Sequence, residues 1–158
     1  PSPPRLWRIG AARVEPLHPH PAWDPGLSTN DNSLVLRLSI GGRSVLLPGD
    51  LEAEGEWIVA ADLRGPGGHA DVLKVPHHGS RTSSTDELLD AVRPAFAVAS
   101  LGDRNRYGFP HVEVVERYRR RGIPLLRTDR CGAVVVHLDP SGELDVETTR
   151  RPSCEPGP

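Results

Sequence analysis

The chain has 158 residues, of which 25% are charged and 37% hydrophobic, and its formal net charge is -2 at pH 7. These values are those of a soluble globular domain and exclude a disordered polyelectrolyte. No stretch approaches the roughly 20 apolar residues of a membrane-spanning helix, and no signal segment precedes the first predicted strand. Because the chain starts at Pro1 and contains no Met, we expect it to be part of a longer protein.

The charged residues and the cysteines are unevenly placed. Acidic residues gather between 52 and 90 and arginines between 104 and 130, so the small net charge does not exclude a polyanionic partner. Cys131 and Cys154 lack the CxxC spacing of a structural zinc site. We expect them to be free thiols or a chance pair, and we assign them no role.

The N-terminal segment, residues 1–32, is rich in proline and shows no sustained period of two or 3.6 residues. We expect an irregular edge segment or loop that leads into the fold. The folded domain is expected over residues 33–150, and residues 151–158 are expected to form a disordered tail.

Regular secondary structure is predicted from residue 33 onward. Two β-strands, 33–40 and 43–47, flank a Gly-Gly turn, which is the pattern of a β-hairpin. Helices and strands then alternate, which predicts a layered α/β fold with helices packed on a sheet. Trp57 and Phe96 are expected in its core. The predicted helices are 52–63, 84–92 and 112–121, and the further strands are 71–75, 95–100, 124–128, 133–138 and 143–149.

Polar side chains directly follow two of these strands. Asp50 follows the second hairpin strand, and His77 and His78 follow strand 71–75. If these strands are neighbours in one sheet, their tips lie about 5 to 10 Å apart, which is within reach of a metal centre. A carboxylate can bridge two divalent ions while imidazole nitrogens occupy terminal positions. Taken singly, a Gly-Asp turn and a pair of loop histidines are each commonly structural.

These residues belong to an ordered series of motifs. The motifs are Asn30-Asp31-Asn32-Ser33, Leu46-Leu47-Pro48-Gly49-Asp50-Leu51-Glu52 with Glu56, Leu73-Lys74-Val75-Pro76-His77-His78-Gly79-Ser80, Asn105 with Tyr107-Gly108, and Arg127-Thr128-Asp129 with Gly132. The series resembles the metallo-β-lactamase-like domain of ComEC-type competence proteins. The match covers roughly residues 14–138, and the order of the motifs is far more specific than any single motif.

The resemblance implies a fold, a cofactor and a reaction. The fold is the second half of a metallo-β-lactamase-like αββα sandwich, in which two sheets lie between helices. The reaction is metal-dependent hydrolysis of one strand of incoming DNA, with two zinc or manganese ions in the complete domain. Asp50 and His78 are the implied catalytic residues, with Asp50 bridging the ions and His78 as a ligand. His77 is either a further ligand or a supporting neighbour.

Four residues are candidates for binding the substrate. Ser80 offers a hydroxyl group near a predicted helix N-terminus, where phosphate binds readily, although helix capping is at least as good an explanation. Asn105 and Tyr107 lie in the loop after strand 95–100, and His111 follows them. Arginines between 104 and 121 can pair with DNA phosphates, although an arginine-rich helix face is more often simply solvated.

The sequence departs from the family pattern at two places. The earlier histidine- and aspartate-rich metal motif of the family is absent, and we expect His18 and His20 in the Pro-rich segment not to bind metal. Where the family usually reads Tyr-Gly-His-Pro, this chain has Phe109, which can neither bind metal nor transfer a proton. His111 is the candidate replacement. Since a catalytic ion needs about three protein ligands, we expect weak or single metal binding and little turnover from this chain alone.

The remaining expectations concern partners, location and alternative functions. The resemblance implies DNA and the membrane channel portion of the same parent protein as partners, without lipid insertion by this segment. It also implies a parent in the cytoplasmic membrane with this domain on the outer side. Two alternatives stay open, namely a free-standing metallo-β-lactamase-fold hydrolase acting on another ester, and a degenerate domain that binds DNA or the channel without catalysis.

Overall fold

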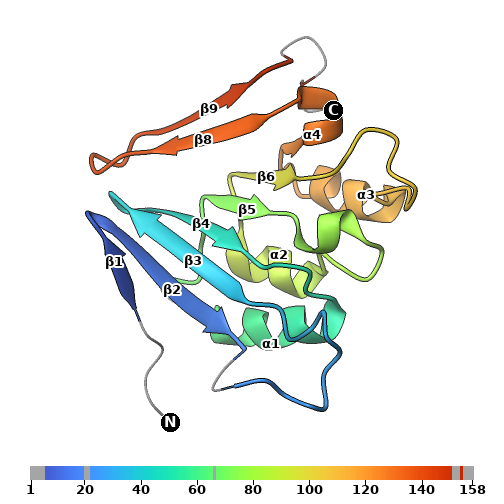
Figure 1. Ribbon diagram of the computed structural model, residues 1–158, viewed down its shortest axis with the longest axis horizontal. Helices are drawn as coiled ribbons and strands as arrows, with labels where there is room; N and C mark the ends of the chain where they lie inside the picture. Colours follow the sequence, from blue (N-terminus) through green and yellow to red (C-terminus); the bar gives the residue numbers. More distant parts are fainter. Residues whose placement is uncertain (1–5, 20–21, 66, 151–153, 155–158) are drawn as a thin grey trace.

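The computed structural model describes residues 6–19, 22–65, 67–150 and 154. Within these ranges, seven strands form a mixed sheet in the order β1-β2-β3-β4-β5-β6-β7, and β8 and β9 form a separate two-stranded sheet (Figure 1). The strands are β1 (Trp7–Ile9), β2 (Ala12–His18), β3 (Val35–Ile40), β4 (Arg43–Leu47), β5 (Val72–Lys74), β6 (Phe96–Ala99), β7 (Leu125–Arg127), β8 (Val134–Leu138) and β9 (Leu144–Thr148). The helices are α1 (Ala53–Asp62), α2 (Asp86–Val92), α3 (Val112–Arg120), α4 (Thr128–Cys131) and the 3-10 helix η1 (Pro76–Gly79).

The mixed α/β fold expected from the sequence is confirmed, including the β3–β4 hairpin and the three longer helices. The sheet changes direction at β4, because β1 to β4 pair antiparallel whereas β4 to β7 run parallel. In the parallel part, Val45 lies opposite Val72, which lies opposite Phe96. The carboxyl ends of β4, β5 and β6 therefore meet at one edge of the sheet, where ligands bind in open α/β folds.

One face of the sheet shares a core with helices α1, α2 and α3 (Figure 1). Strand residues alternate between the two faces, so Leu46, Leu73 and Ala97 are fully buried while their neighbours Val45 and Val98 stay partly exposed. The helices contribute the buried side chains Val59, Leu88, Leu89, Val114 and Tyr118. A seven-stranded sheet flanked by helices is consistent with half of a metallo-β-lactamase-like sandwich.

The turn of the β8–β9 hairpin contacts the β3–β4 turn of the main sheet. Arg43 Nε donates to the Gly142 carbonyl oxygen over 3.0 Å. Gly41 has a φ of +57°, and a Cβ at this position would lie 2.4 Å from the Asp139 carbonyl oxygen. The close approach of the β3–β4 and β8–β9 turns therefore requires glycine at position 41.

The expectation of an irregular N-terminal segment is wrong for two stretches. β2 pairs with β3 over most of its length, and β1 extends the sheet by one more strand. The pairing shifts register between Pro16 and His18, where a proline without an N–H group is tolerated. The strand depends on its pairing with β3, a tertiary contact that local periodicity does not report. His20 and the tail positions 151–153 and 155–158 lie outside the described residues.

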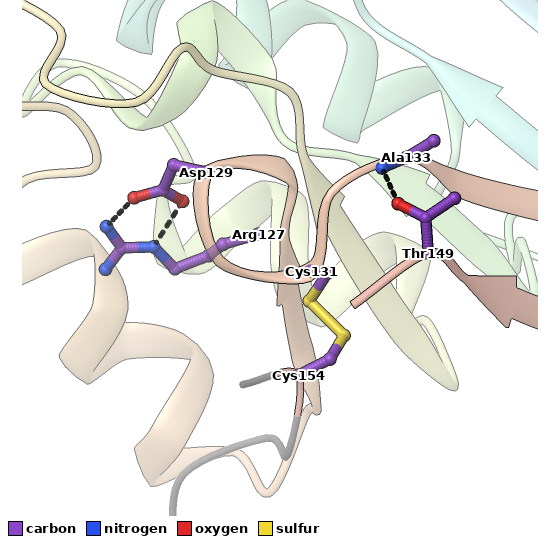
Figure 2. Close-up of a disulfide and its surroundings, with 6 residues drawn as sticks. All are labelled: Arg127, Asp129, Cys131, Ala133, Thr149 and Cys154. Atoms are coloured by element: carbon purple, nitrogen blue, oxygen red, sulfur yellow. Dashed lines mark hydrogen bonds and ion pairs between the residues drawn. A yellow bond between two sulfur atoms is a disulfide. The ribbon is translucent and has the colours of Figure 1, made fainter. Parts of the chain in front are cut away.

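Two further expectations need correction. Trp57 is not a core residue, because 60% of its surface is exposed, whereas Glu56 beside it is fully buried. Cys131 and Cys154 are not free thiols but a pair, joined by a disulfide between α4 and the C-terminal tail (Figure 2). Their separation of 23 residues follows no short cysteine motif, so the pairing could not be read from spacing. Among the described helices, none has the length and apolar character needed to cross a bilayer.

Candidate metal centre

The turn after β4 places Asp50 at the edge of the sheet. Gly49 has a φ of +64°, and a Cβ there would lie 2.8 Å from the Ser33 Cβ, so the turn requires glycine. The Asp50 N–H donates to Ser33 Oγ over 3.0 Å. Asp31 Oδ1 accepts from the backbone N–H groups of Glu52 and Gly55 at 3.1 and 2.9 Å, which caps the start of α1. The Asn-Asp-Asn-Ser run thus orients the loop that carries Asp50.

The two histidines form a strained turn directly after β5. His77 and His78 have φ values of 43° and 54°, a region that non-glycine residues rarely occupy. Such conformations cost of order 1–3 kcal/mol each and cluster at functional sites. The turn is tied to the Gly49 carbonyl oxygen, which accepts from the His77 N–H at 3.2 Å and from Lys74 Nζ at 3.0 Å. The histidine turn and the Asp50 turn therefore form one connected unit.

His78 faces Asp50 across the end of the sheet. Its Nδ1 lies 2.5 Å from the Ser100 carbonyl oxygen, and its Nε2 lies 3.5 Å from Asp50 Oδ1. Because a carbonyl oxygen can only accept, Nδ1 carries a proton, and Nε2 is the ring nitrogen that faces Asp50. A histidine held from behind in this way is the usual arrangement at protein metal sites.

His77 faces a different carboxylate. Its Nδ1 is buried without a hydrogen-bond partner in the described structure, and the nearest carboxylate oxygen is Glu52 Oε1 at 3.4 Å. Glu52 Oε1 also accepts from Thr82 Oγ1 at 2.9 Å. Glu52 is not among the sequence-predicted site residues, although its position two residues after Asp50 was a usable signal. Asp50–His78 and Glu52–His77 form two acid–imidazole pairs side by side.

Lys74 supplies a positive charge beside Asp50. Its Nζ lies 3.8 Å from Asp50 Oδ1, and 22% of its side-chain surface is exposed. Burial lowers the pKa of Lys74 below its ordinary value, and the charge of Asp50 opposes this shift. The ammonium group therefore offsets part of the carboxylate charge at the sheet edge.

A cavity of about 620 Å³ opens in front of these residues. Asp50, His77 and His78 line one side, and Tyr107 and Phe109 line the other. The phenyl ring of Phe109 meets the His77 ring edge-to-face, with centroids 5.9 Å apart and an interplanar angle of 69°. The site is therefore a cleft with an acid–imidazole wall and an aromatic wall.

The sequence-predicted substrate residues divide into two groups. Asn105 and Tyr107 line the cleft. Ser80 lies outside that lining, and its Oγ is 3.0 Å from Thr82 Oγ1. His111 is the N-cap of α3, and its ring meets the Phe109 ring edge-to-face with centroids 5.4 Å apart. Neither Ser80 nor His111 is brought to the cleft surface by this arrangement.

Three of the six predicted arginines have structural partners and lie outside the cleft lining. Arg117 donates to the Ser83 carbonyl oxygen at 2.7 Å, Arg119 pairs with Glu116, and Arg121 contacts two acidic residues of α2. Arg104 and Arg106 belong to the cleft loop itself, between β6 and α3. In that loop, Arg104 lies 3.7 Å from Asp103, and Arg106 donates to the Tyr107 hydroxyl at 2.8 Å.

Two other motifs brace the loops around the cleft. Thr128 Oγ1 accepts from the Leu101 N–H at 2.8 Å and donates to the Leu101 carbonyl oxygen at 2.7 Å. Glu56 accepts from the N–H groups of Ser84 and Thr85, both at 2.6 Å, which ties α1 to the segment after the histidine turn. Burial raises the pKa of Glu56 to about 7, and these hydrogen bonds oppose the shift.

The donors present fit a metal ion in kind but not in number. A carboxylate and a neutral imidazole are common ligands of zinc and manganese. Across the described residues, however, no three His, Cys, Asp or Glu side chains converge closely enough to hold an ion. Asp50 and His78 face each other at the cleft, and the His77–Glu52 pair lies beside them. His18, whose Nε2 lies 2.6 Å from the Asp31 carbonyl oxygen, is buried in a structural contact.

Comparison with known proteins places this chain among competence proteins. It is 43% identical over 121 residues to ComE operon protein 3 of Bacillus subtilis (strain 168), which covers 77% of this chain. It is 41% identical over 122 residues to competence protein ComA of Neisseria gonorrhoeae, which also covers 77% of this chain. The chain belongs to the ComEC family of competence proteins. No protein-family model matches it.

A third relative is recombination protein 2 of Haemophilus influenzae, with 39% identity over 134 residues, or 85% of this chain. The chain spans only 15 to 18% of the length of these three ComEC-family relatives. The family resemblance stated from the motifs is therefore confirmed. The names of the relatives refer to proteins much longer than this chain.

Proposed function

We propose that this chain supplies one half of a metal-dependent phosphodiesterase centre that cuts one strand of incoming DNA in a ComEC-type uptake protein. The observation that carries the proposal is the Asp50–His78 pair. Nε2 of His78 faces Asp50 Oδ1 at 3.5 Å while the Ser100 carbonyl oxygen holds Nδ1. A carboxylate and an oriented imidazole at adjacent strand tips are the donors expected of a hydrolytic metal site.

Each residue of the site has a proposed task. Asp50 and His78 hold the ion, and Glu52 fixes the neighbouring His77 ring. A bound divalent ion lowers the pKa of its water and neutralises a phosphoryl oxygen. The cleft of about 620 Å³ admits the phosphodiester, and Lys74 at 3.8 Å from Asp50 limits the negative charge that the incoming phosphate meets.

The complete centre needs further ligands. Two oriented donors fall below the roughly three that a catalytic ion requires. We assign the missing ligands to sequence outside these residues, in the remainder of the parent protein. In the same proposal the parent lies in the cytoplasmic membrane, this domain lies on its outer side next to the channel portion, and DNA phosphates are the ligand.

The test is hydrolysis of a labelled single-stranded oligonucleotide by a full-length parent carrying this sequence. Asp50→Ala is expected to reduce the cleavage rate by at least about 100-fold, because the ion loses its carboxylate ligand. The matched control is His69→Ala, since His69 Nε2 lies 3.7 Å from Asp71 at a site away from the cleft. Unchanged cleavage by the Asp50 variant would refute the assignment.

The second candidate is a domain that binds DNA or the channel without catalysis. Phe109 favours it, because a phenyl ring occupies the cleft wall where the family resemblance expects an imidazole. In that case the full-length parent would bind the oligonucleotide but leave it intact at any concentration of Mn²⁺ or Zn²⁺. Cleavage that depends on Asp50 would exclude this candidate.

A further inference from the structure

The aromatic wall of the cleft contains an exposed stack. The rings of Tyr107 and Phe109 lie with centroids 5.5 Å apart and planes inclined by 21°, which is an offset-stacked arrangement. Tyr107 is 59% exposed, although exposing a large aromatic surface is unfavourable. Phe109 in turn meets the His77 ring edge-to-face, with centroids 5.9 Å apart. The aromatic contacts therefore extend from solvent to the acid–imidazole wall.

The loop that carries the stack is held by its own hydrogen bonds. Asn105 Oδ1 accepts from the Phe109 N–H at 2.8 Å, and Asn105 Nδ2 donates to the Phe109 carbonyl oxygen at 2.8 Å. The Gly108 N–H donates to the Asn105 carbonyl oxygen at 3.3 Å. A ring presented on a loop already ordered in this way loses little additional conformational entropy when it binds a ligand.

Positive charge accompanies the exposed ring. The guanidinium group of Arg106 lies 5.0 Å from the Tyr107 ring centroid, and its Nη2 donates to the Tyr107 hydroxyl at 2.8 Å. Arg104 in the same loop has a side chain that is 92% exposed and lies 3.7 Å from the likewise exposed carboxylate of Asp103, a surface ion pair that solvent weakens. A flat aromatic surface next to exposed guanidinium groups matches a nucleotide, because the base can stack while the phosphate pairs with arginine.

We propose that Tyr107 and Phe109 form a stacking platform for an unpaired base of the strand that enters the cleft, with Arg106 moving from the ring to the adjacent phosphate. This inference rests on the proposed function, because it takes DNA as the ligand. Bases in a duplex have no free faces for such a platform, so the platform selects single strands. It also tolerates any base sequence, since every base offers a π face.

The test compares two fluorescently labelled oligomers of equal length and charge, a thymidine 12-mer and an abasic 12-mer, by anisotropy with this chain. The thymidine oligomer is expected to bind about 5- to 150-fold more tightly, the range for stacking of one base. Tyr107→Ala is expected to abolish this difference, and Tyr107→Phe to retain it. Trp57→Ala, which removes a ring that is 60% exposed on α1, is the control and should leave the difference intact.

The outcomes separate this inference from the proposed function. Equal affinity of the unaltered chain for both oligomers would refute the platform but leave the phosphodiesterase proposal standing, because phosphates alone would account for the binding. A preference that persists in the Tyr107→Ala variant, or tighter binding of a duplex of the same length, would also refute the platform. Failure to bind either oligomer would count against both proposals.

Discussion

Protonation of Glu56 should make the stability of this domain depend on pH in a defined window. The carboxyl group is fully buried and accepts from the Ser84 and Thr85 N–H groups, while the Thr85 side chain and Arg117 are the other groups that lower its pKa. Burial raises its pKa from 4.5 to about 7 in the folded state. The folded state therefore holds a proton that the unfolded chain releases between these two values.

The sign and size follow from this difference in proton binding. Below pH 4.5 Glu56 is protonated in both the folded and the unfolded state, so burial of a charge does not reduce stability. As pH rises from 4.5 toward 7, the free energy of unfolding falls. Above about pH 7 the contribution of Glu56 to that free energy no longer changes. The rise of the Glu56 pKa from 4.5 to about 7 corresponds to a loss of stability on the order of 3 kcal/mol. Glu56→Gln keeps the shape without the titrating proton, so its stability should lack this fall.

The assay is urea unfolding followed by far-ultraviolet circular dichroism at several pH values from 4.5 to 8. The quantity of interest is the difference in unfolding free energy between the unaltered chain and Glu56→Gln. Glu54→Gln, which changes an exposed acid on the same helix, corrects for general charge effects. A difference that stays constant, or that grows in favour of the unaltered chain as pH rises, would refute the claim that burial outweighs the hydrogen bonds.

Two further predictions concern the cleft support and the disulfide. Ser33→Ala removes the acceptor of the Asp50 N–H and should weaken binding of Mn²⁺ by about 10-fold, as loss of a supporting contact typically does. Calorimetric titration measures this affinity, and Ser39→Ala, on β3 and outside the cleft lining, is the control. Unaltered affinity of the Ser33 variant would contradict the role of Ser33. Reduction of the Cys131–Cys154 disulfide, which links residues 23 apart, should lower the free energy of unfolding by about 3 kcal/mol, because the unfolded chain gains conformational entropy. Urea unfolding with and without reductant measures this change. An unfolding midpoint that does not depend on reductant would contradict the prediction.

The parts of the fold set by local patterns could be predicted from the sequence. The β3–β4 hairpin follows from alternating apolar residues around two glycines, and the carboxyl-terminal positions of Asp50 and His78 follow from the strands before them. The existence of β2 depends instead on its pairing with β3. A strand with a proline and few β-branched residues gives only a weak local signal.

The fine structure of the site depends on contacts between distant residues. The sequence left the roles of His77 and His78 unresolved, because what orients His78 is a backbone carbonyl 22 positions away at Ser100. Glu52 meets His77 only because both follow adjacent parallel strands. The burial of Glu56 and the exposure of Trp57 were likewise set by how α1 packs, which a sequence pattern with little amphipathic contrast does not reveal.

The central claim is that Asp50 and His78 form a metal site, and calorimetric titration of Mn²⁺ and Zn²⁺ into this chain tests it most directly. The account predicts weak binding of one ion, lost in the Asp50→Ala, His78→Ala double variant and retained in the His69→Ala control. Equal binding by the double variant, or none by the unaltered chain, would contradict it.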